Sequence, residues 1–257
     1  MAKKDGSLLD RLAWRREFRR WKRLAAAAGV SDLASLRRHR VQARQLRTHI
    51  DQLIHVADGR LALPRIGSNA FHVPHGSDWA WRPELWRGPL GEQGKASVRS
   101  KSMLGNEVTL FHDCDRSELT LRQLRNLREA DLAPFGLRMD VFAFDGSFLS
   151  LVIDFPPDAV AGLKRRHLIR LDTIVELEKP LEIFARLNIK HGPNTEQLVR
   201  ELPLHDDERM VEFDLAYSNL NEKRVERIWL DLIFEGPEMN QVVIRDLTFS
   251  RRPRAEL

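Results

Sequence analysis

From Leu137 to Phe249 the chain alternates apolar and polar residues, and this alternation limits the possible folds more than any other feature. A period of two places successive side chains on opposite faces of an extended strand. Turn residues such as Asp145-Gly146 and Gly236-Pro237 separate the alternating segments. The predicted strands lie at 137–144, 147–154, 168–178, 181–190, 197–204, 210–217, 225–235 and 241–249. Connections this short leave no room for crossover helices, so we predict a mainly β protein, an antiparallel β-sandwich of the jelly-roll kind.

Two helices are expected before the strands. In residues 8–28 the aromatic residues recur at helical spacing, and Gly29 ends the pattern. The second helix runs to about Ala57 and carries a narrow apolar seam with steps of three and four, like that of a coiled coil. Its members are Leu36, His39, Ala43, Leu46, Ile50, Leu53 and Ala57.

These patterns predict three parts of the chain. They are a basic helical arm at 1–57, a Gly/Pro/Trp-rich segment at 58–106 that packs on the body, and a sandwich domain at 107–257. Short strands are expected around Phe71 and at 79–81, and a further strand at 107–112. Residues 118–129 fit a helix or a strand, and the spacing of their leucines mildly favours a helix.

Positive charge is concentrated in the arm. Residues 1–51 hold 14 lysines and arginines against five acidic residues, whereas the whole chain has a net charge of only +5, so the rest is mildly acidic. The expected contact residues are Trp14, Arg15, Arg16, Phe18, Arg19, Arg20, Trp21, Lys22 and Arg23. An acidic protein surface is the favoured partner, and an anionic membrane surface is the next. Nucleic acid is the least favoured, since no nucleic-acid-binding motif is present.

The cellular location is predicted from the absence of membrane-spanning and secretory segments in the sequence. No apolar run approaches the roughly 20 residues that span a bilayer. The N-terminus shows no secretory pattern, and the single cysteine, Cys114, cannot form an internal disulfide. We therefore expect a cytoplasmic protein, free or peripheral to a membrane.

Several strand residues point away from the apolar set and suggest a ligand. They are Arg170, Asp172, Arg186, Asn188, Trp229 and Asp231. If these strands share one sheet, its outer face carries an indole ring among carboxylate, amide and guanidinium groups. A sugar ring can stack on the indole while its hydroxyls bond the polar groups. The competing interpretation is a solvated face with cross-strand salt bridges.

Catalytic and metal-binding motifs give little support to an enzyme. His112-Asp113-Cys114-Asp115 contains an Asp-x-Asp of the kind that holds a divalent ion, but no nucleotide-binding βαβ pattern precedes it. The sequence has no zinc spacing, nucleophile elbow or phosphate-binding loop. We therefore expect no catalytic residues, no metal ligands and no cofactor.

Several stretches carry a family resemblance. FDGSFLSLVIDFP at 144–156, ARLNIKHGPNTEQL at 185–198 and the ending from Ile228 resemble an uncharacterised family of Rhodobacterales (Alphaproteobacteria), and so does DWAWRPELWRGPL at 78–90. That resemblance implies no assigned activity. IRDLTF at 244–249 is also similar to the last strand of galactose-binding-like carbohydrate-binding modules.

Together these features predict a non-catalytic polysaccharide-binding module with a basic docking arm. A structural or protein-interaction protein without a small ligand, or a peripheral membrane adaptor, is the alternative. A polysaccharide-active enzyme is the third interpretation.

Overall fold

The computed structural model of the protein describes residues 8–62, 71–128, 131–203 and 208–254. Its α-helices are α1 (Leu8–Ala27), α2 (Leu33–Ala62) and α3 (Glu84–Arg87). The first seven strands are β1 (Trp79–Trp81), β2 (Gly94–Ala96), β3 (Ser102–Leu104), β4 (Val108–His112), β5 (Leu119–Arg125), β6 (Phe135–Val141) and β7 (Leu149–Asp154). The others are β8 (His167–Leu177), β9 (Ile183–His191), β10 (Asn194–Glu201), β11 (Glu208–Asp214), β12 (Val225–Phe234) and β13 (Asn240–Pro253).

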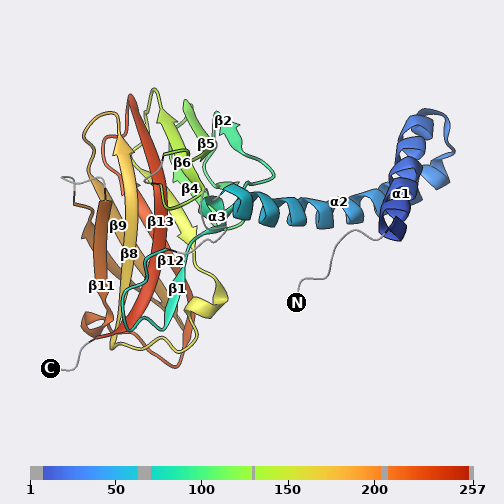
Figure 1. Cartoon of the computed structure of the whole chain (residues 1–257). Coiled ribbons are helices and arrows are strands. Elements are labelled where there is room, and N and C mark those ends of the chain that lie inside the picture. Colours follow the sequence, from blue (N-terminus) through green and yellow to red (C-terminus); the bar gives the residue numbers. More distant parts are fainter. Residues whose placement is uncertain (1–7, 63–70, 129–130, 204–207, 255–257) are drawn as a thin grey trace. The chain divides into compact units, whose positions relative to one another are not determined.

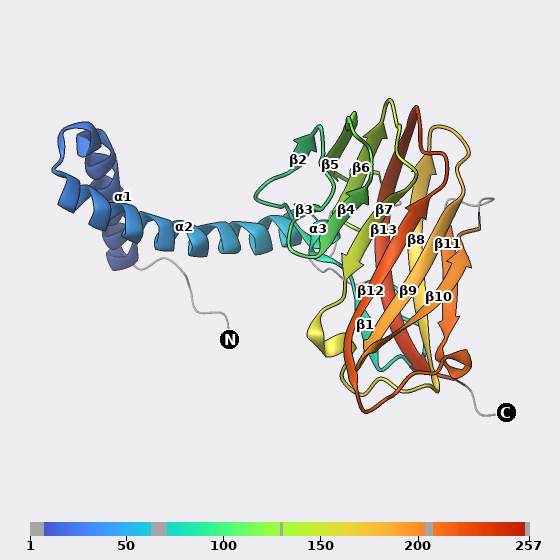
Figure 2. The same cartoon turned by 180° about the vertical axis from the view of Figure 1, so that it is seen from behind.

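The strands form two antiparallel sheets that pack face to face. The seven-stranded sheet has the order β11-β8-β13-β6-β5-β2, with β1 paired to β13, and it faces the reader in Figure 1. The six-stranded sheet has the order β10-β9-β12-β7-β4-β3 and faces the reader in Figure 2. The prediction of a mainly β antiparallel sandwich with helices at its N-terminus is confirmed.

The alternating apolar residues fill the space between the sheets. On β8 the side chains of Ile169 and Leu171 are buried, and on β12 those of Leu230 and Leu232 are buried in the same core. Because strand side chains alternate, the residues between them face outward from their own sheet. This rule places the polar side chains of each strand on one of the two outer faces.

The Trp-rich segment packs into this core. Trp81 pairs with Phe249 across β1 and β13, and the two rings stack with centroids 5.6 Å apart. Trp86 is fully buried on α3, and its indole N–H donates to the carbonyl of Ile244 at 3.0 Å. These contacts give residues 79–86 a fixed place on the sandwich.

Two local predictions differ from the structure. Residues 119–125 form strand β5, and the leaning toward a helix is wrong. Leu119 and Leu121 are buried on the core side, whereas Leu127 is 82% exposed, so the three-residue spacing of the leucines does not mark one buried face. Of the short strand expected around Phe71, residues 71–74 are irregular, and the part before Phe71 lies outside the described residues.

The chain divides into two compact units, Met1–Ile54 and His55–Leu257. The first unit consists of α1 and most of α2. These two helices correspond to the two predicted helices and have nearly the same bounds. Ser31 and Asp32 lie between them, and the Asp32 carboxylate accepts the backbone N–H of Ser35 at 2.9 Å, which caps α2. Among the described helices, none is long and apolar enough to cross a membrane.

Candidate ligand-binding pocket

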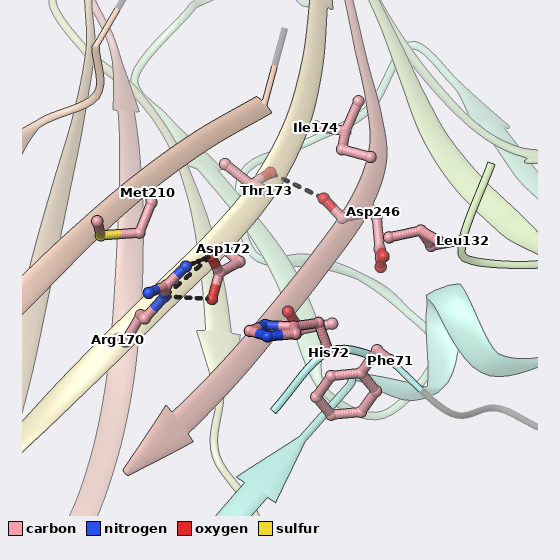
Figure 3. Close-up of a pocket in the computed structure, with 10 residues that line it drawn as sticks. Phe71, His72, Leu132, Arg170, Asp172, Thr173, Ile174, Met210 and Asp246 are labelled. Carbon is pink, nitrogen blue, oxygen red and sulfur yellow. Dashed lines mark hydrogen bonds and ion pairs between the residues drawn. The ribbon is translucent and has the colours of Figure 1, made fainter. Parts of the chain in front are cut away.

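A pocket lies on the outer face of the seven-stranded sheet, over β11, β8 and β13. Strand register places Asp172 directly between Met210 and Thr248. Arg170 lies two residues further along the same face of β8, because its neighbours Ile169 and Leu171 face the core. Phe71 and His72, from the segment before β1, complete the hollow (Figure 3). Its volume is about 280 Å³.

An ion pair between Arg170 and Asp172 forms one wall of the pocket. The guanidinium Nε donates to both carboxylate oxygens at 3.0 and 2.8 Å, and Nη2 donates to Oδ1 at 2.6 Å. These bonds to Asp172 raise the pKa of Arg170 further above its ordinary value. Two residues on the same face of one strand thus hold each other in a fixed, nearly planar arrangement (Figure 3).

A second, buried ion pair lies at the inner end of the pocket. Asp246 accepts Arg82 Nε at 2.9 Å and Nη2 at 2.7 Å, and the Arg82 side chain is only 1% exposed. The register of β13 shifts between Ile244 and Asp246, and this bulge turns Asp246 to the outer face. Burial raises the pKa of Asp246, and the guanidinium of Arg82 opposes that shift.

The same arginine supports the aromatic wall. The Arg82 guanidinium lies 4.9 Å from the centroid of the Phe71 ring, in a cation–π contact. Because Arg82 is buried and Phe71 is half-buried, the ring face that meets Arg82 is the inner one. Phe71 also lines the hollow, so part of its side chain borders the pocket.

Apolar side chains line the rim of the pocket. Met210 is 43% exposed and Leu132 is 51% exposed, on opposite sides of the labelled polar groups in Figure 3. Ile174 and Thr248 also line the hollow. The pocket therefore combines an aromatic face, an apolar rim and a few fixed donors and acceptors, as small-molecule sites do.

The structure separates the six predicted ligand-binding residues into two groups. Arg170 and Asp172 lie on β8, in the seven-stranded sheet, and line the pocket. The other four, Arg186, Asn188, Trp229 and Asp231, lie on β9 and β12, in the six-stranded sheet. Both strand sets bury their alternate residues in one core, so the two groups face opposite sides of the sandwich. The prediction of a single shared face is wrong for Arg170 and Asp172.

Three of the four residues on the six-stranded sheet, Arg186, Asn188 and Asp231, form a hydrogen-bonded network. Arg186 Nε donates to Asp231 Oδ2 at 2.8 Å, and the Asn188 amide donates to the same oxygen at 3.2 Å. Gln197 in turn donates to Asn188 at 3.0 Å. Register pairs Trp229 with Asn188 and Asp231 with Arg186, which brings the four predicted residues side by side.

Trp229 faces outward on that sheet, because Ile228 and Leu230 on either side of it are buried in the core. Its ring is half-buried, with the Arg227 guanidinium 5.1 Å from the centroid. Arg227 also donates to Asp154 on β7 at 3.1 Å. The ring contacts of the tryptophans at 79 and 81 are with other residues: Trp79 stacks on Phe155, and Trp81 is tilted against Phe155.

The Asp-x-Asp stretch has a local structural role. The Asp113 carboxylate accepts the Ser147 backbone N–H at 2.7 Å, the Ser147 hydroxyl at 2.6 Å and the Phe148 N–H at 3.3 Å. The hydrogen bond from Ser147 lowers the pKa of Asp113. Within the part of the chain that the structure describes, no three His, Cys, Asp or Glu side chains are grouped as a metal site would require.

Several pocket residues could not be recognised from the sequence. Phe71, His72 and Met210 carry no motif, and they lie far from Asp172 along the chain. Asp246 offers the only signal, as a lone carboxylate in the apolar ending IRDLTF. An acidic residue in a strand that is otherwise buried needs a partner, and the structure supplies it as Arg82.

Solved structures with a similar sandwich include carbohydrate-binding modules. The family 11 module of Clostridium thermocellum, in complex with a β-1,3-1,4-mixed-linked tetrasaccharide, is 10% identical with a TM-score of 0.40 over 66% of this chain and 100% of the module. The C-terminal family 22 module of Clostridium thermocellum Xyn10B is 6% identical with a TM-score of 0.37 over 72% of this chain and 100% of the module.

A phage enzyme shows a similar likeness. The enzymatically active domain of tailspike protein 4 of bacteriophage CBA120 is 6% identical with a TM-score of 0.40 over 55% of this chain, which spans only 19% of that protein. TM-scores of 0.40 and below carry no inference about a ligand.

Comparison by sequence gives the family. No curated protein matches the chain. One family model, described as a family of unknown function (DUF6478), matches residues 1–257. The chain therefore belongs to the DUF6478 family.

Proposed function

We propose that the protein is a non-catalytic carbohydrate-binding β-sandwich that holds one sugar ring of a neutral polysaccharide in the pocket on its seven-stranded sheet. The observation that carries the proposal is that the forked Arg170–Asp172 pair and the Phe71 ring line one hollow. A pyranose ring needs this combination, since it presents C–H groups to an aromatic face and hydroxyls to its sides. The volume of about 280 Å³ is near the lower end for small-molecule sites, which suits a single ring.

The charges in the pocket favour a neutral sugar. Arg170 is paired with Asp172, and Asp246 is paired with Arg82, so each formal charge in the lining has an opposite charge beside it. An acidic sugar would have to compete with Asp172 for the guanidinium of Arg170. A neutral hydroxyl can accept from the guanidinium and donate to the carboxylate while the ion pair stays intact.

The same pairing supports binding rather than catalysis. A general acid or base must exchange a proton with the substrate. The Asp172 carboxylate accepts three hydrogen bonds from Arg170, and the Asp246 carboxylate, 5% exposed, accepts two from Arg82. Both carboxylates are thus engaged as acceptors for guanidinium groups.

The Trp229 surface is the second candidate place for a glycan. Its indole faces outward beside Asn188 and Asp231, and this arrangement suits a chain that lies flat across the sheet. The donors and acceptors of its network are bonded to one another, as Arg170 and Asp172 are. The Arg170–Asp172 pair differs in that it lines a concave hollow. We therefore place the sugar in the pocket and use the Trp229 surface as the comparison.

A glycan array tests the proposal with the full-length chain. We expect wild-type protein to bind neutral polysaccharides, and calorimetry to give an affinity that falls about ten-fold in Phe71→Ala and in Asp172→Ala, from one lost stack or one lost charged hydrogen bond. Trp229→Ala is the matched control, since it removes an outward aromatic ring from the other sheet, and its affinity should stay within about two-fold.

Two results would argue against the proposal. If Trp229→Ala abolished binding while Phe71→Ala preserved it, the glycan site would be on the six-stranded sheet. If the folded protein bound no glycan but co-purified with a protein in constant proportion, the interaction-protein alternative would replace it.

A further inference from the structure

Helix α1 contains three consecutive units of one aromatic residue followed by two cations. They are 14–16 (Trp-Arg-Arg), 18–20 (Phe-Arg-Arg) and 21–23 (Trp-Lys-Arg). The units start four and then three residues apart, which matches the helical repeat. Each residue turns the helix by about 100°. The aromatic residues thus form one stripe. Arg15, Arg19 and Lys22 form a cation stripe about 100° from it, and the remaining cations form a stripe on nearly the opposite face of the helix.

The stripes are open to solvent. Trp14 is 67% exposed and Phe18 is 59% exposed, with their ring centroids 6.1 Å apart. The third ring, Trp21, is half-buried, and the Arg20 guanidinium lies 5.7 Å from its centroid. All six cations of the three units are exposed. Two large aromatic side chains in water beside exposed cations point to a surface that covers both.

The positive charge of the helix is largely unbalanced within the protein. Arg20 lies 3.3 Å from Glu17. Among the side chains that the structure describes, no carboxylate forms an ion pair with the other cations of the three units, Arg15, Arg16, Arg19, Lys22 and Arg23. The charge is therefore available to an external anion.

The first part of α2 continues the same chemistry. Arg37, Arg40, Arg44 and Arg47 follow steps of three, four and three, so they form a basic stripe along that helix. All four are exposed, and Arg47 donates to Asp51 at 3.1 Å. Both long helices thus present rows of cations.

We propose that α1 binds the surface of an anionic phospholipid bilayer, with Trp14 and Phe18 at the level of the headgroups and the nearer cation stripe, Arg15, Arg19 and Lys22, against lipid phosphates. Tryptophan and arginine are the residues that interfacial helices place at this depth. A bilayer surface is fluid, so its phosphates can meet this cation stripe without a fixed register.

Other polyanions fit the helix less well. A protein partner would have to hold carboxylates at fixed positions opposite the nearer cation stripe while it covered the aromatic stripe. A nucleic acid duplex would neutralise the cations but leave Trp14 and Phe18 in water. This choice rests on α1 alone and does not depend on the glycan pocket.

Vesicle flotation with the full-length chain tests the proposal. We expect the protein to float with vesicles of phosphatidylcholine and about 30% phosphatidylglycerol, and to stay unbound with phosphatidylcholine alone or in about 0.5 M salt. The triple variant Arg15→Gln/Arg19→Gln/Lys22→Gln should bind these vesicles on the order of 100-fold more weakly, from roughly five-fold for each cation. The double variant Trp14→Ala/Phe18→Ala should also lose binding at an unchanged net charge.

The matched control is Arg99→Gln/Arg122→Gln/Lys223→Gln, which removes two arginines and one lysine from exposed sites on the sandwich. It should float like the wild type, and far-UV circular dichroism should show equal helix content in all variants, since glutamine is a good helix former. The proposal is wrong if wild-type protein does not bind anionic vesicles, or if the control loses as much binding as the α1 variant. It is also wrong if only duplex DNA or an acidic protein binds α1.

Discussion

The guanidinium of Arg82 and the carboxylate of Asp246 form a buried ion pair that joins the chain before α3 to the last strand, 164 residues later. This ion pair has two structural roles. The Arg82 guanidinium neutralises the carboxylate that the β13 bulge turns into the pocket, and it also contacts the Phe71 ring. The stability of the sandwich and the shape of its pocket thus depend on the same contact.

We predict that Arg82→Met destabilises the protein by about 3–5 kcal/mol, because it leaves Asp246 buried without its opposite charge. Burial has a larger effect on the pKa of Asp246 than Arg82 has, so removing both charges should recover much of the loss. Urea unfolding of Arg82→Met, Asp246→Leu and the double variant measures this coupling. If the free-energy losses of the two single variants simply add in the double variant, the pair is not the structural unit described here.

His167 should make the stability of the sandwich depend on pH. Its side chain is buried, and burial lowers the pKa of His167 below its ordinary value of 6.5. The negative charge of Asp78 raises this pKa, whereas the positive charges of Arg251, Arg166 and Lys164 lower it further. Between pH 6.5 and the lowered pKa, the unfolded chain binds a proton that the folded chain does not. Stability is therefore lost as pH falls through this window.

The variant His167→Gln removes the titrating group and can still accept the Lys164 backbone N–H that His167 Nδ1 accepts at 3.1 Å. We expect its free energy of unfolding to vary less with pH below 6.5 than that of the wild type. For one proton the difference in slope is at most about 1.4 kcal/mol per pH unit. Parallel curves for the two proteins would show that His167 titrates alike in the folded and unfolded chains.

A glycine on β6 sets how closely β6 and β13 approach. A Cβ atom at Gly136 would lie 2.9 Å from the carbonyl oxygen of Ile244, the same oxygen that accepts the Trp86 indole N–H. Gly136→Ala should therefore displace backbone and cost about 1–3 kcal/mol in unfolding free energy. Gly91→Ala is the control, because nothing lies within 4 Å of a Cβ there, and it should change stability by less than about 0.5 kcal/mol. Equal stabilities for the two variants would contradict this packing.

Strands such as β8 and β12 could be predicted because one face of each is buried. Burial of Ile169 and Leu171, or of Leu230 and Leu232, imposes the period of two that the sequence displays. The same pattern does not tell which sheet a strand joins, since the inward residues of both sheets enter one core. Consecutive strands β8 and β9 join different sheets, and for that reason Asp172 and Arg186 were wrongly expected on one face.

The pocket could be predicted only in part. Arg170 and Asp172 follow from alternation, because they face away from a buried set on their own strand. Phe71 and Asp246 do not follow from any local pattern. Phe71 lies in irregular chain, and Asp246 is turned outward by a bulge that depends on the pairing of β13 with β8. Long-range contacts of this kind leave no periodic signal in the sequence.

The chain carries methionines at positions that separate the two candidate glycan surfaces. Met210 lines the pocket, whereas Met103 lies in register with Thr109, and through Val152 with Asp231, on the outer face of the six-stranded sheet. Directly paired residues share a face, so Met103 lies on the same outer face as Trp229, on the edge strand β3, three strands from β12. Met139 is buried in the core and serves as an internal reference.

Methyl NMR of protein labelled at methionine, titrated with the neutral oligosaccharide that the array selects, is the most direct test of glycan binding in the pocket. We predict a saturable shift of the Met210 methyl resonance while the Met103 and Met139 resonances stay in place. A shift of Met103 with Met210 unchanged, or no shift of any methionine at saturating oligosaccharide, would contradict the assignment of the pocket as the sugar site.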